Sequence, residues 1–96
     1  MKKQLNENVK LKDFADALAR LKTTNEVTSF LRDICTPNEI QSIVDRWEVA
    51  GLLTKNFSYR QIQNKTGVSV TTIGRVARYL NSPDGGYQIA MKRVNE

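Results

Sequence analysis

The stretch that most constrains the fold is residues 57–81, in which a glycine separates two short amphipathic segments. Ser58 is a suitable N-cap for a first helix, which we expect to end near Lys65. Gly67 follows where the chain must turn, because glycine adopts left-handed backbone conformations that cost other residues more. Val68 is then placed to fill the angle between two helices. This spacing predicts a helix-turn-helix unit over residues 58–81.

The second segment of this unit is apolar along one side and polar along the other. Its apolar residues recur at the three- and four-residue steps of a packed helix: Ile73, Val76, Ala77 and Leu80. Ser69 is placed to cap this helix. The leading end and the opposite side carry hydroxyl and guanidinium groups: Ser69, Thr71, Thr72, Arg75 and Arg78. Such groups contact phosphates and base edges in the major groove of DNA.

The distribution of charge favours DNA as the partner. The chain has 15 basic and 10 acidic residues and a net charge of +5. Between Glu48 and Asp84 there is no acidic residue, and the same interval holds five cations: Lys55, Arg60, Lys65, Arg75 and Arg78. A helix pair that is merely solvated normally carries both signs of charge. We therefore expect the helix-turn-helix unit to face a polyanion.

A protein-interaction or dimerisation module without specific DNA binding is the alternative. Two short helices joined at a glycine also occur in domains that do not bind nucleic acid. An acid-free surface suits an acidic protein as well. What separates the two hypotheses is the leading end of the second helix, where a protein-binding surface is expected to carry aromatic or aliphatic anchors. Hydroxyl groups stand there instead.

Composition excludes several classes of protein. Histidine is absent and Cys35 is the only cysteine, so an intrachain disulfide and a thiol metal cluster are excluded. The usual catalytic constellations and a glycine-rich phosphate loop are also missing, so we expect no enzyme, no catalytic residue and no metal. The chain shows neither an export signal nor a membrane span. We expect a cytoplasmic protein.

Apolar periodicity predicts two helices at the beginning of the chain. Residues 1–8 are polar, and we expect them to be loose. The pattern predicts a first helix over residues 9–22 and a second over about residues 26–35. Thr24 or Asn25 is the expected N-cap of the second helix.

The clearest helix start outside the helix-turn-helix unit is Thr-Pro-Asn-Glu at residues 36–39. Thr36 is the expected N-cap, with Pro37 at the first helical position and Glu39 reaching back. The long helix that follows is apolar on two sides and must be covered on both. The second cover can come from the helix-turn-helix unit, from another subunit, or from both. We expect Trp47 to anchor the core.

A Ser-Pro-Asp-Gly-Gly turn and a short C-terminal helix over residues 87–94 complete the chain. The sum is about six helices and no strand, which predicts an all-α fold. With 96 residues the chain is a single domain near the lower size limit for a comfortable core, so oligomerisation is attractive. Residues 9–54 are then the dimerisation and core helices that carry residues 58–81.

Several of these residues together resemble the Trp repressor family. The shared features are Thr36-Pro37-Asn38-Glu39, Arg46 in the long helix, the Ser58-x-Arg60 start, Asn64, Gly67, and Thr72-Ile73 followed by Arg75. The likeness covers about residues 30–81 and is closer still to bacterial Trp repressor-related proteins of the YerC/YecD type. It implies an all-α homodimer whose N-terminal and last helices intertwine between subunits.

The resemblance also implies roles for individual side chains. Three would face base edges: Val70, Thr71 and Thr72. Three would lie along the DNA backbone or at the groove edge: Tyr59, Arg60 and Gln63. With Lys65, Arg75 and Arg78 as further phosphate contacts, we expect a transcriptional regulator of the repressor type, bound as a dimer to a palindromic operator in double-stranded DNA.

An effector site is a further implication of the resemblance. In the family, two arginines flank a flat effector such as tryptophan. They match Arg46 and Arg75 here, with Thr72 nearby. Val76 stands where the repressor has a glycine, and Tyr79 where it has a serine. This added bulk either fills the cavity or reshapes it for another small aromatic molecule. An ordinary ion pair or exposed charge for Arg46 and a phosphate contact for Arg75 are the alternatives.

Overall fold

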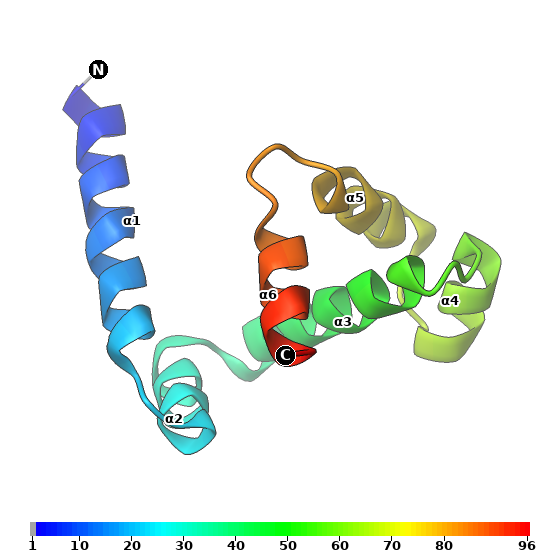
Figure 1. The fold of residues 1–96 in the computed structure, drawn as a ribbon, viewed down its shortest axis with the longest axis horizontal. Coiled ribbons are helices and arrows are strands. Elements are labelled where there is room, and N and C mark those ends of the chain that lie inside the picture. The colour runs from blue at the N-terminus through cyan, green and yellow to red at the C-terminus, as the bar shows by residue number, and fades with distance from the viewer. Residues whose placement is uncertain (1) are drawn as a thin grey trace. The chain divides into compact units, whose positions relative to one another are not determined.

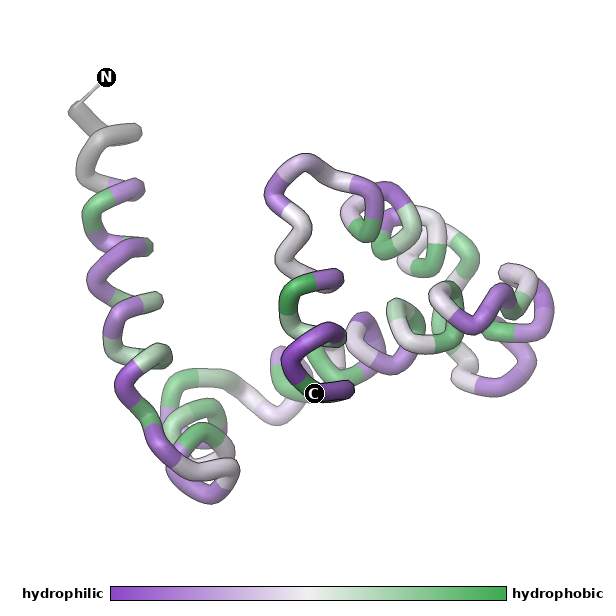
Figure 2. Tube along the Cα trace, in the orientation of Figure 1, coloured by the Kyte–Doolittle hydropathy of each residue, from purple (hydrophilic) through white to green (hydrophobic). Residues whose placement is uncertain are grey.

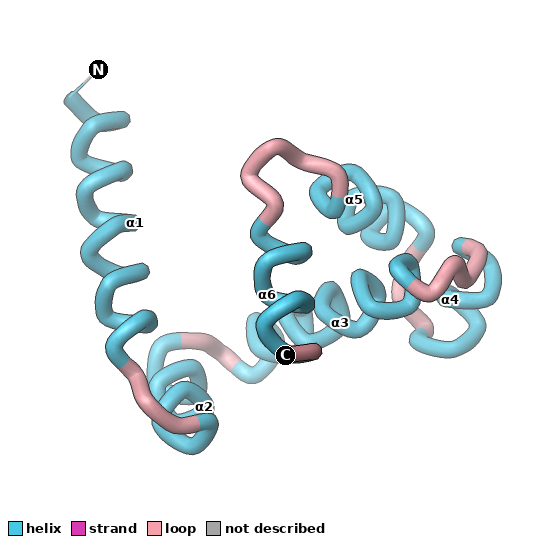
Figure 3. The backbone as a smooth tube through the Cα atoms, in the orientation of Figure 1, coloured by secondary structure: helices cyan, strands magenta, loops and turns pink. Residues whose placement is uncertain are grey.

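A computed structural model describes residues 2–96, and side chains from Glu7 onward. The described residues form six α-helices and no strand, as predicted (Figures 1 and 3). The helices are α1 (Lys2–Arg20), α2 (Thr24–Ile34), α3 (Pro37–Thr54), α4 (Tyr59–Thr66), α5 (Val70–Leu80) and α6 (Gly86–Val94). None of these helices is both long and apolar enough to cross a membrane.

The chain divides into two compact units, residues 1–37 and residues 38–96. The sequence predicts a single domain, and this stays a prediction. The physical basis of the division is burial, because every buried side chain among the described residues belongs to the second unit. The first unit consists of α1 and α2, and the second contains α3 from its second residue together with α4, α5 and α6.

The first unit is a helix pair without a core of its own. The rings of Phe14 in α1 and Phe30 in α2 have their centroids 5.8 Å apart, within the range of favourable aromatic pairs. Described side chains in this unit are at most half-buried, and Val9, Leu11 and Ile34 are exposed. Figure 2 shows hydrophobic residues recurring along both helices among hydrophilic ones. The pair therefore leaves apolar surface uncovered.

Two predicted boundaries in the first unit were displaced. The helical backbone of α1 begins at Lys2, whereas periodicity places the start at Val9 and a loose segment before it. Residues 2–8 include lysine, glutamine, leucine and glutamate, which have good intrinsic helix propensity without an apolar stripe. Met1 lies outside the described residues.

The N-cap of α2 is Thr23, not Thr24 or Asn25 as predicted. The Thr23 hydroxyl accepts a hydrogen bond from the Glu26 amide at 3.0 Å, and the Glu26 carboxylate accepts one from the Lys22 amide at 2.8 Å. A Thr-x-x-Glu spacing is a recognised start signal. It was present in the sequence and identifies Thr23.

Helix α3 begins at Pro37, as the Thr-Pro-Asn-Glu signal predicts. Its second half supplies Val49 and Ala50 to the core, both fully buried. Trp47 is 41% exposed, so the prediction that it anchors the core of the single chain was wrong. The buried residues of α3 are Val49 and Ala50, and Val49, two residues after Trp47, projects from the opposite side of the helix.

The core of the second unit joins α3, α4 and α5. It consists of Val49, Ala50, Ile62, Val68, Ile73, Val76 and Leu80. Helix α5 contributes three of these residues, and α4 and α6 both pack against it. The C-terminal helix is attached by the side-chain amide of Gln88, which donates to the Leu80 carbonyl at 2.7 Å. The sequence of α5 therefore organises the unit.

Replacement of Val76 by alanine tests the importance of this core. Its side chain is 1% exposed, so the loss of two methyl groups at about 0.8 kcal/mol each, with a cavity term, should lower the free energy of unfolding by about 2 kcal/mol. Val70→Ala is the matched control, because Val70 lies in the same helix and is 48% exposed. Urea unfolding at one protein concentration measures both. Equal midpoints for the two variants would contradict this core.

Candidate nucleic-acid interface

The turn of the helix-turn-helix unit is built as the sequence predicts. Gly67 has φ +75°, in the left-handed region, and its amide donates to the Gln63 carbonyl at 2.8 Å. Val68 is buried beneath the turn. The Thr66 hydroxyl spans the turn, because it donates to the Ile62 carbonyl at 2.8 Å and accepts from the Val68 amide at 3.1 Å. The angle between α4 and α5 is thus held by both backbone and side chains.

The start of α4 carries a complete capping box. The Gln61 amide donates to the Ser58 hydroxyl at 3.1 Å, and the Gln61 side chain accepts from the Ser58 amide at 2.8 Å. Ser58 is therefore the N-cap that the sequence predicts. The part played by Gln61 was missed, although the Ser-x-x-Gln spacing signals it.

The start of α5 is organised by one hydroxyl group. Ser69 Oγ accepts from the Thr72 amide at 3.2 Å and donates to Thr72 Oγ1 at 3.1 Å, which confirms Ser69 as N-cap. Because Ser69 uses its only hydroxyl hydrogen on Thr72, the hydroxyl hydrogen of Thr72 remains available to an outside acceptor. Thr72 itself is half-buried.

Burial of one side of α5 orients the other side outward. Ile73, Val76 and Leu80 are buried, so residues on the remaining surface of the helix face solvent. Nine of the ten predicted DNA-binding residues are exposed: Tyr59, Arg60, Gln63 and Lys65 around α4, and Ser69, Val70, Thr71, Arg75 and Arg78 around α5. Thr72 is the half-buried exception. The predicted contact residues therefore share one accessible pair of helices.

The cations of this surface are not neutralised by carboxylates. Among the described residues, the ion pairs are Lys12–Asp16 and Arg93–Glu96, both outside the helix-turn-helix unit. Two of the cations lie against aromatic rings instead. Lys65 Nζ is 5.7 Å from the centroid of Phe57, and the Arg75 guanidinium carbon is 5.1 Å from the centroid of Tyr79. These contacts leave the positive charge free to act on a phosphate.

The three predicted effector-binding residues have separate surroundings. Thr72 is bonded to Ser69, and Arg75 lies over Tyr79. Arg46 is exposed on α3, and no hydrogen bond or ion pair joins it to either of the others in the described part of the chain. The bulk added at Val76 belongs to the core, where it is 1% exposed.

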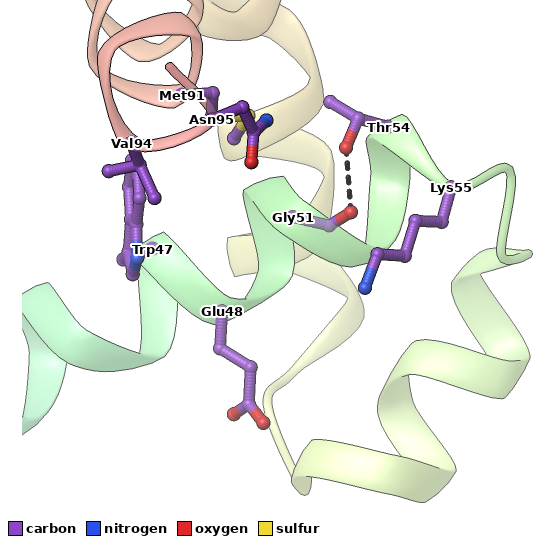
Figure 4. Close-up of a pocket in the computed structure, with 8 residues that line it drawn as sticks. All are labelled: Trp47, Glu48, Gly51, Thr54, Lys55, Met91, Val94 and Asn95. Atoms are coloured by element: carbon purple, nitrogen blue, oxygen red, sulfur yellow. Dashed lines mark hydrogen bonds between the residues drawn. The ribbon is translucent and has the colours of Figure 1, made fainter.

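Two hollows lined by residues of α3 and α6 share Trp47. One, of about 240 Å³, is lined by Trp47, Gly51, Met91 and Val94 among others (Figure 4). The second, of about 440 Å³, is lined by Trp47, Tyr79, Tyr87 and Ala90 with residues of the preceding turn. Among the described residues no cluster of histidine, cysteine, aspartate or glutamate is arranged to hold a metal. The surfaces of both hollows are mainly apolar.

Sequence reasoning missed the two aromatic neighbours of the cations. Tyr79 follows Arg75 by four residues, the spacing at which side chains meet on a helix, so that signal was available. Phe57 precedes Lys65 by eight residues across the start of α4. No local pattern predicts such a contact, because it depends on how the chain enters the helix.

Sequence comparison relates this chain to one protein family and to a bacterial relative. Residues 9–95 match a family model described as Trp repressor protein. The chain is 42% identical over 81 residues to a Bacillus subtilis (strain 168) protein described as uncharacterized protein YerC, an alignment that covers 84% of this chain and 78% of the relative.

Two solved structures have the same fold. One is a TrpR like protein from Eubacterium eligens ATCC 27750, with a TM-score of 0.81, 39% identity, and coverage of 88% of this chain and 87% of that chain. The other comes from Staphylococcus aureus, and its description names it provisionally as a Trp repressor. Its TM-score is 0.85 at 33% identity, and the match covers 99% of this chain and 95% of that chain.

The Gly67→Ala substitution tests the turn that sets the angle of this surface. No atom lies within 4 Å of a Cβ added at Gly67, so the cost is purely conformational, roughly 1 to 2 kcal/mol for a left-handed residue. Gly86→Ala is the control, because an added Cβ there also meets nothing and its φ is not positive. Urea unfolding should show a lower free energy of unfolding for Gly67→Ala and an unchanged one for Gly86→Ala. Equal stability of the Gly67→Ala variant and the parent would contradict the expected cost of placing alanine in the left-handed conformation.

Proposed function

The chain belongs to the Trp repressor family, and from this premise we propose that it is a sequence-specific DNA-binding transcriptional regulator of the repressor type. It acts as a homodimer on a palindromic operator. In this proposal the helix-turn-helix unit enters the major groove, and the core helices set the distance between two such units.

The observation that carries this proposal is the exposed face of α4 and α5, which contains no carboxylate. Acidic residues are absent between Glu48 and Asp84, and the cations in the interval are exposed. Neutralisation of phosphates by such cations supplies the sequence-independent part of DNA affinity. The four cations proposed for this role are Arg60, Lys65, Arg75 and Arg78.

Sequence discrimination is assigned to the leading end of α5. Val70, Thr71 and Thr72 form its first turn, where a recognition helix places side chains against base edges. The Thr71 and Thr72 hydroxyls can each donate to or accept from a base, and the Val70 side chain can pack against a thymine methyl group. Tyr59 and Gln63 are exposed on α4 and are assigned to the DNA backbone or the groove edge.

A second copy of the chain is the partner that the uncovered apolar surface favours. The α1–α2 pair has no buried side chain among its described residues, and α3 and α6 expose a further apolar set: Ile43, Val44, Trp47, Ile89 and Val94. Two copies can cover these surfaces reciprocally, since each has both an unburied helix pair and an apolar face on α3 and α6. Symmetry of this kind matches the two-fold symmetry of a palindrome.

Selection from a random duplex DNA library with the purified protein tests the function directly. Enrichment of a palindrome, with half-sites about 34 Å apart, is the expected result. Binding that is salt-sensitive but blind to sequence would replace the proposal with general polyanion binding. If no DNA is retained, the surface belongs to a protein-interaction module instead.

Lys65→Ala should weaken binding to all DNA sequences alike. Loss of one phosphate contact lowers the magnitude of the slope of log K against log salt by about one. Thr71→Ala should instead reduce the preference for the selected site and leave the slope unchanged. Fluorescence anisotropy over a range of KCl concentrations measures both effects. Lys10→Ala is the control, since Lys10 is an exposed lysine of α1. An unchanged slope for Lys65→Ala would remove Lys65 from the interface.

Leu11→Glu should disrupt the dimer. Leu11 is 64% exposed in the single chain, so the substitution costs the isolated chain little but places an unpaired charge in a dimer contact. We expect the dissociation constant of the dimer to rise by about a hundredfold or more. Lys10→Gln lowers the net charge by one without removing an apolar group and should have no effect. Sedimentation equilibrium measures the mass against the 10.9 kDa of one chain. A Leu11→Glu dimer as tight as the parent would contradict this assignment.

A further inference from the structure

Arg75 and Tyr79 form a stacked pair on the outward side of α5. The guanidinium carbon lies 5.1 Å from the ring centroid, within the distance at which the face of an aromatic ring attracts a cation. The two residues are four apart, so the pair spans one helical turn. Arg75 is exposed and Tyr79 is 46% exposed. The contact therefore lies at the surface proposed to face DNA.

Burial of a neighbouring core residue sets the side of α5 on which this pair lies. Val76 stands between the two residues in the sequence and is 1% exposed, so its burial fixes the rotation of α5 about its axis. The Tyr79 ring also borders the hollow that Trp47 and Tyr87 line. Tyr79 therefore has Trp47 and Tyr87 along the same hollow, and Arg75 lies over its ring.

Among the described residues, no carboxylate forms an ion pair with this guanidinium. Neither ion pair formed by the described residues involves Arg75, and the acid-free interval surrounds it in sequence. A ring restrains the side chain without neutralising it, whereas an aspartate or glutamate would do both. The guanidinium keeps its donors and its full charge for a phosphate, and fewer rotamers have to be frozen when that phosphate binds.

We propose that Tyr79 is a positioning residue that holds Arg75 ready for a DNA phosphate from within the chain, so that this contact needs no small-molecule effector. The inference rests on the proposed DNA-binding function and adds to it a residue that positions one phosphate contact. Tyr79 acts through Arg75, and the ring face rather than the phenol hydroxyl does the positioning.

Two substitutions of Tyr79 separate the ring from the hydroxyl. Tyr79→Phe keeps the ring face and should bind the selected operator as tightly as the parent. Tyr79→Leu keeps apolar bulk and helix propensity but removes the ring, and its dissociation constant should rise about two- to five-fold, as an exposed cation–π contact allows. The urea midpoints of both variants should match that of the parent, which excludes a general loss of folding.

A double-mutant cycle shows whether Tyr79 acts through Arg75. In an Arg75→Ala background, Tyr79→Leu should cause no further loss of affinity. In an Arg78→Ala background, the matched control, Tyr79→Leu should cause the same fold-loss as in the parent. Equal losses in all three backgrounds would overturn the proposal, and so would a Tyr79→Phe protein as weak as Tyr79→Leu.

Two measurements distinguish failure of this inference from failure of the proposed DNA-binding function. In the free protein, ring-current displacement of the Arg75 side-chain NMR signals should be present in the parent and in Tyr79→Phe and absent in Tyr79→Leu. Addition of tryptophan should leave the operator dissociation constant unchanged, and a tenfold tightening would overturn the proposal that the Arg75 contact needs no effector. A protein that retains specific DNA binding but lacks the cycle coupling refutes the inference alone. If the NMR displacement is present but the protein binds no DNA, both the proposed function and this inference are refuted.

Discussion

The burial of one side of α5 is the constraint on which the rest of the second unit depends. Ile73, Val76 and Leu80 pack with residues of α3 and α4, and this contact sets which residues of α5 face solvent. The exposed hydroxyl and guanidinium groups are a consequence of that rotation. The hydrogen bonds at the turn add precision, because Ser69 and Thr66 fix where α5 begins relative to α4. Core and proposed interface are therefore two sides of one helix.

Apolar surface is distributed unevenly between the two units. All seven buried side chains of the described residues lie in residues 38–96, while α1 and α2 contribute amphipathic helices with little to bury against. Helices of this length draw most of their stability from packing of an apolar face and not from propensity. A second copy supplies that packing in the proposed function, so folding of the first unit and assembly of a two-fold DNA-binding protein become one process.

An arginine that stacks on an aromatic ring acts differently at a DNA-binding surface from an arginine that is paired with a carboxylate. A carboxylate beside Arg75 would orient it and cancel its charge, whereas the Tyr79 ring only orients it. Lys65 over Phe57 follows the same pattern. The absence of acidic residues between Glu48 and Asp84 thus has two effects: it keeps the surface positive and leaves aromatic side chains as the restraints on its cations.

The sequence by itself determined the local structure: Ser58 and Ser69 as N-caps, Gly67 as the left-handed turn, the start of α3 at Pro37, and the polar side of α5. These features depend on interactions over three or four residues, which a sequence displays directly. Only the tertiary structure decided that Trp47 is exposed and that Lys65 lies over Phe57. The exposure of Trp47 depends on where other helices pack, since periodicity shows that a face is apolar without showing what covers it. The Lys65–Phe57 contact depends on how the chain enters α4.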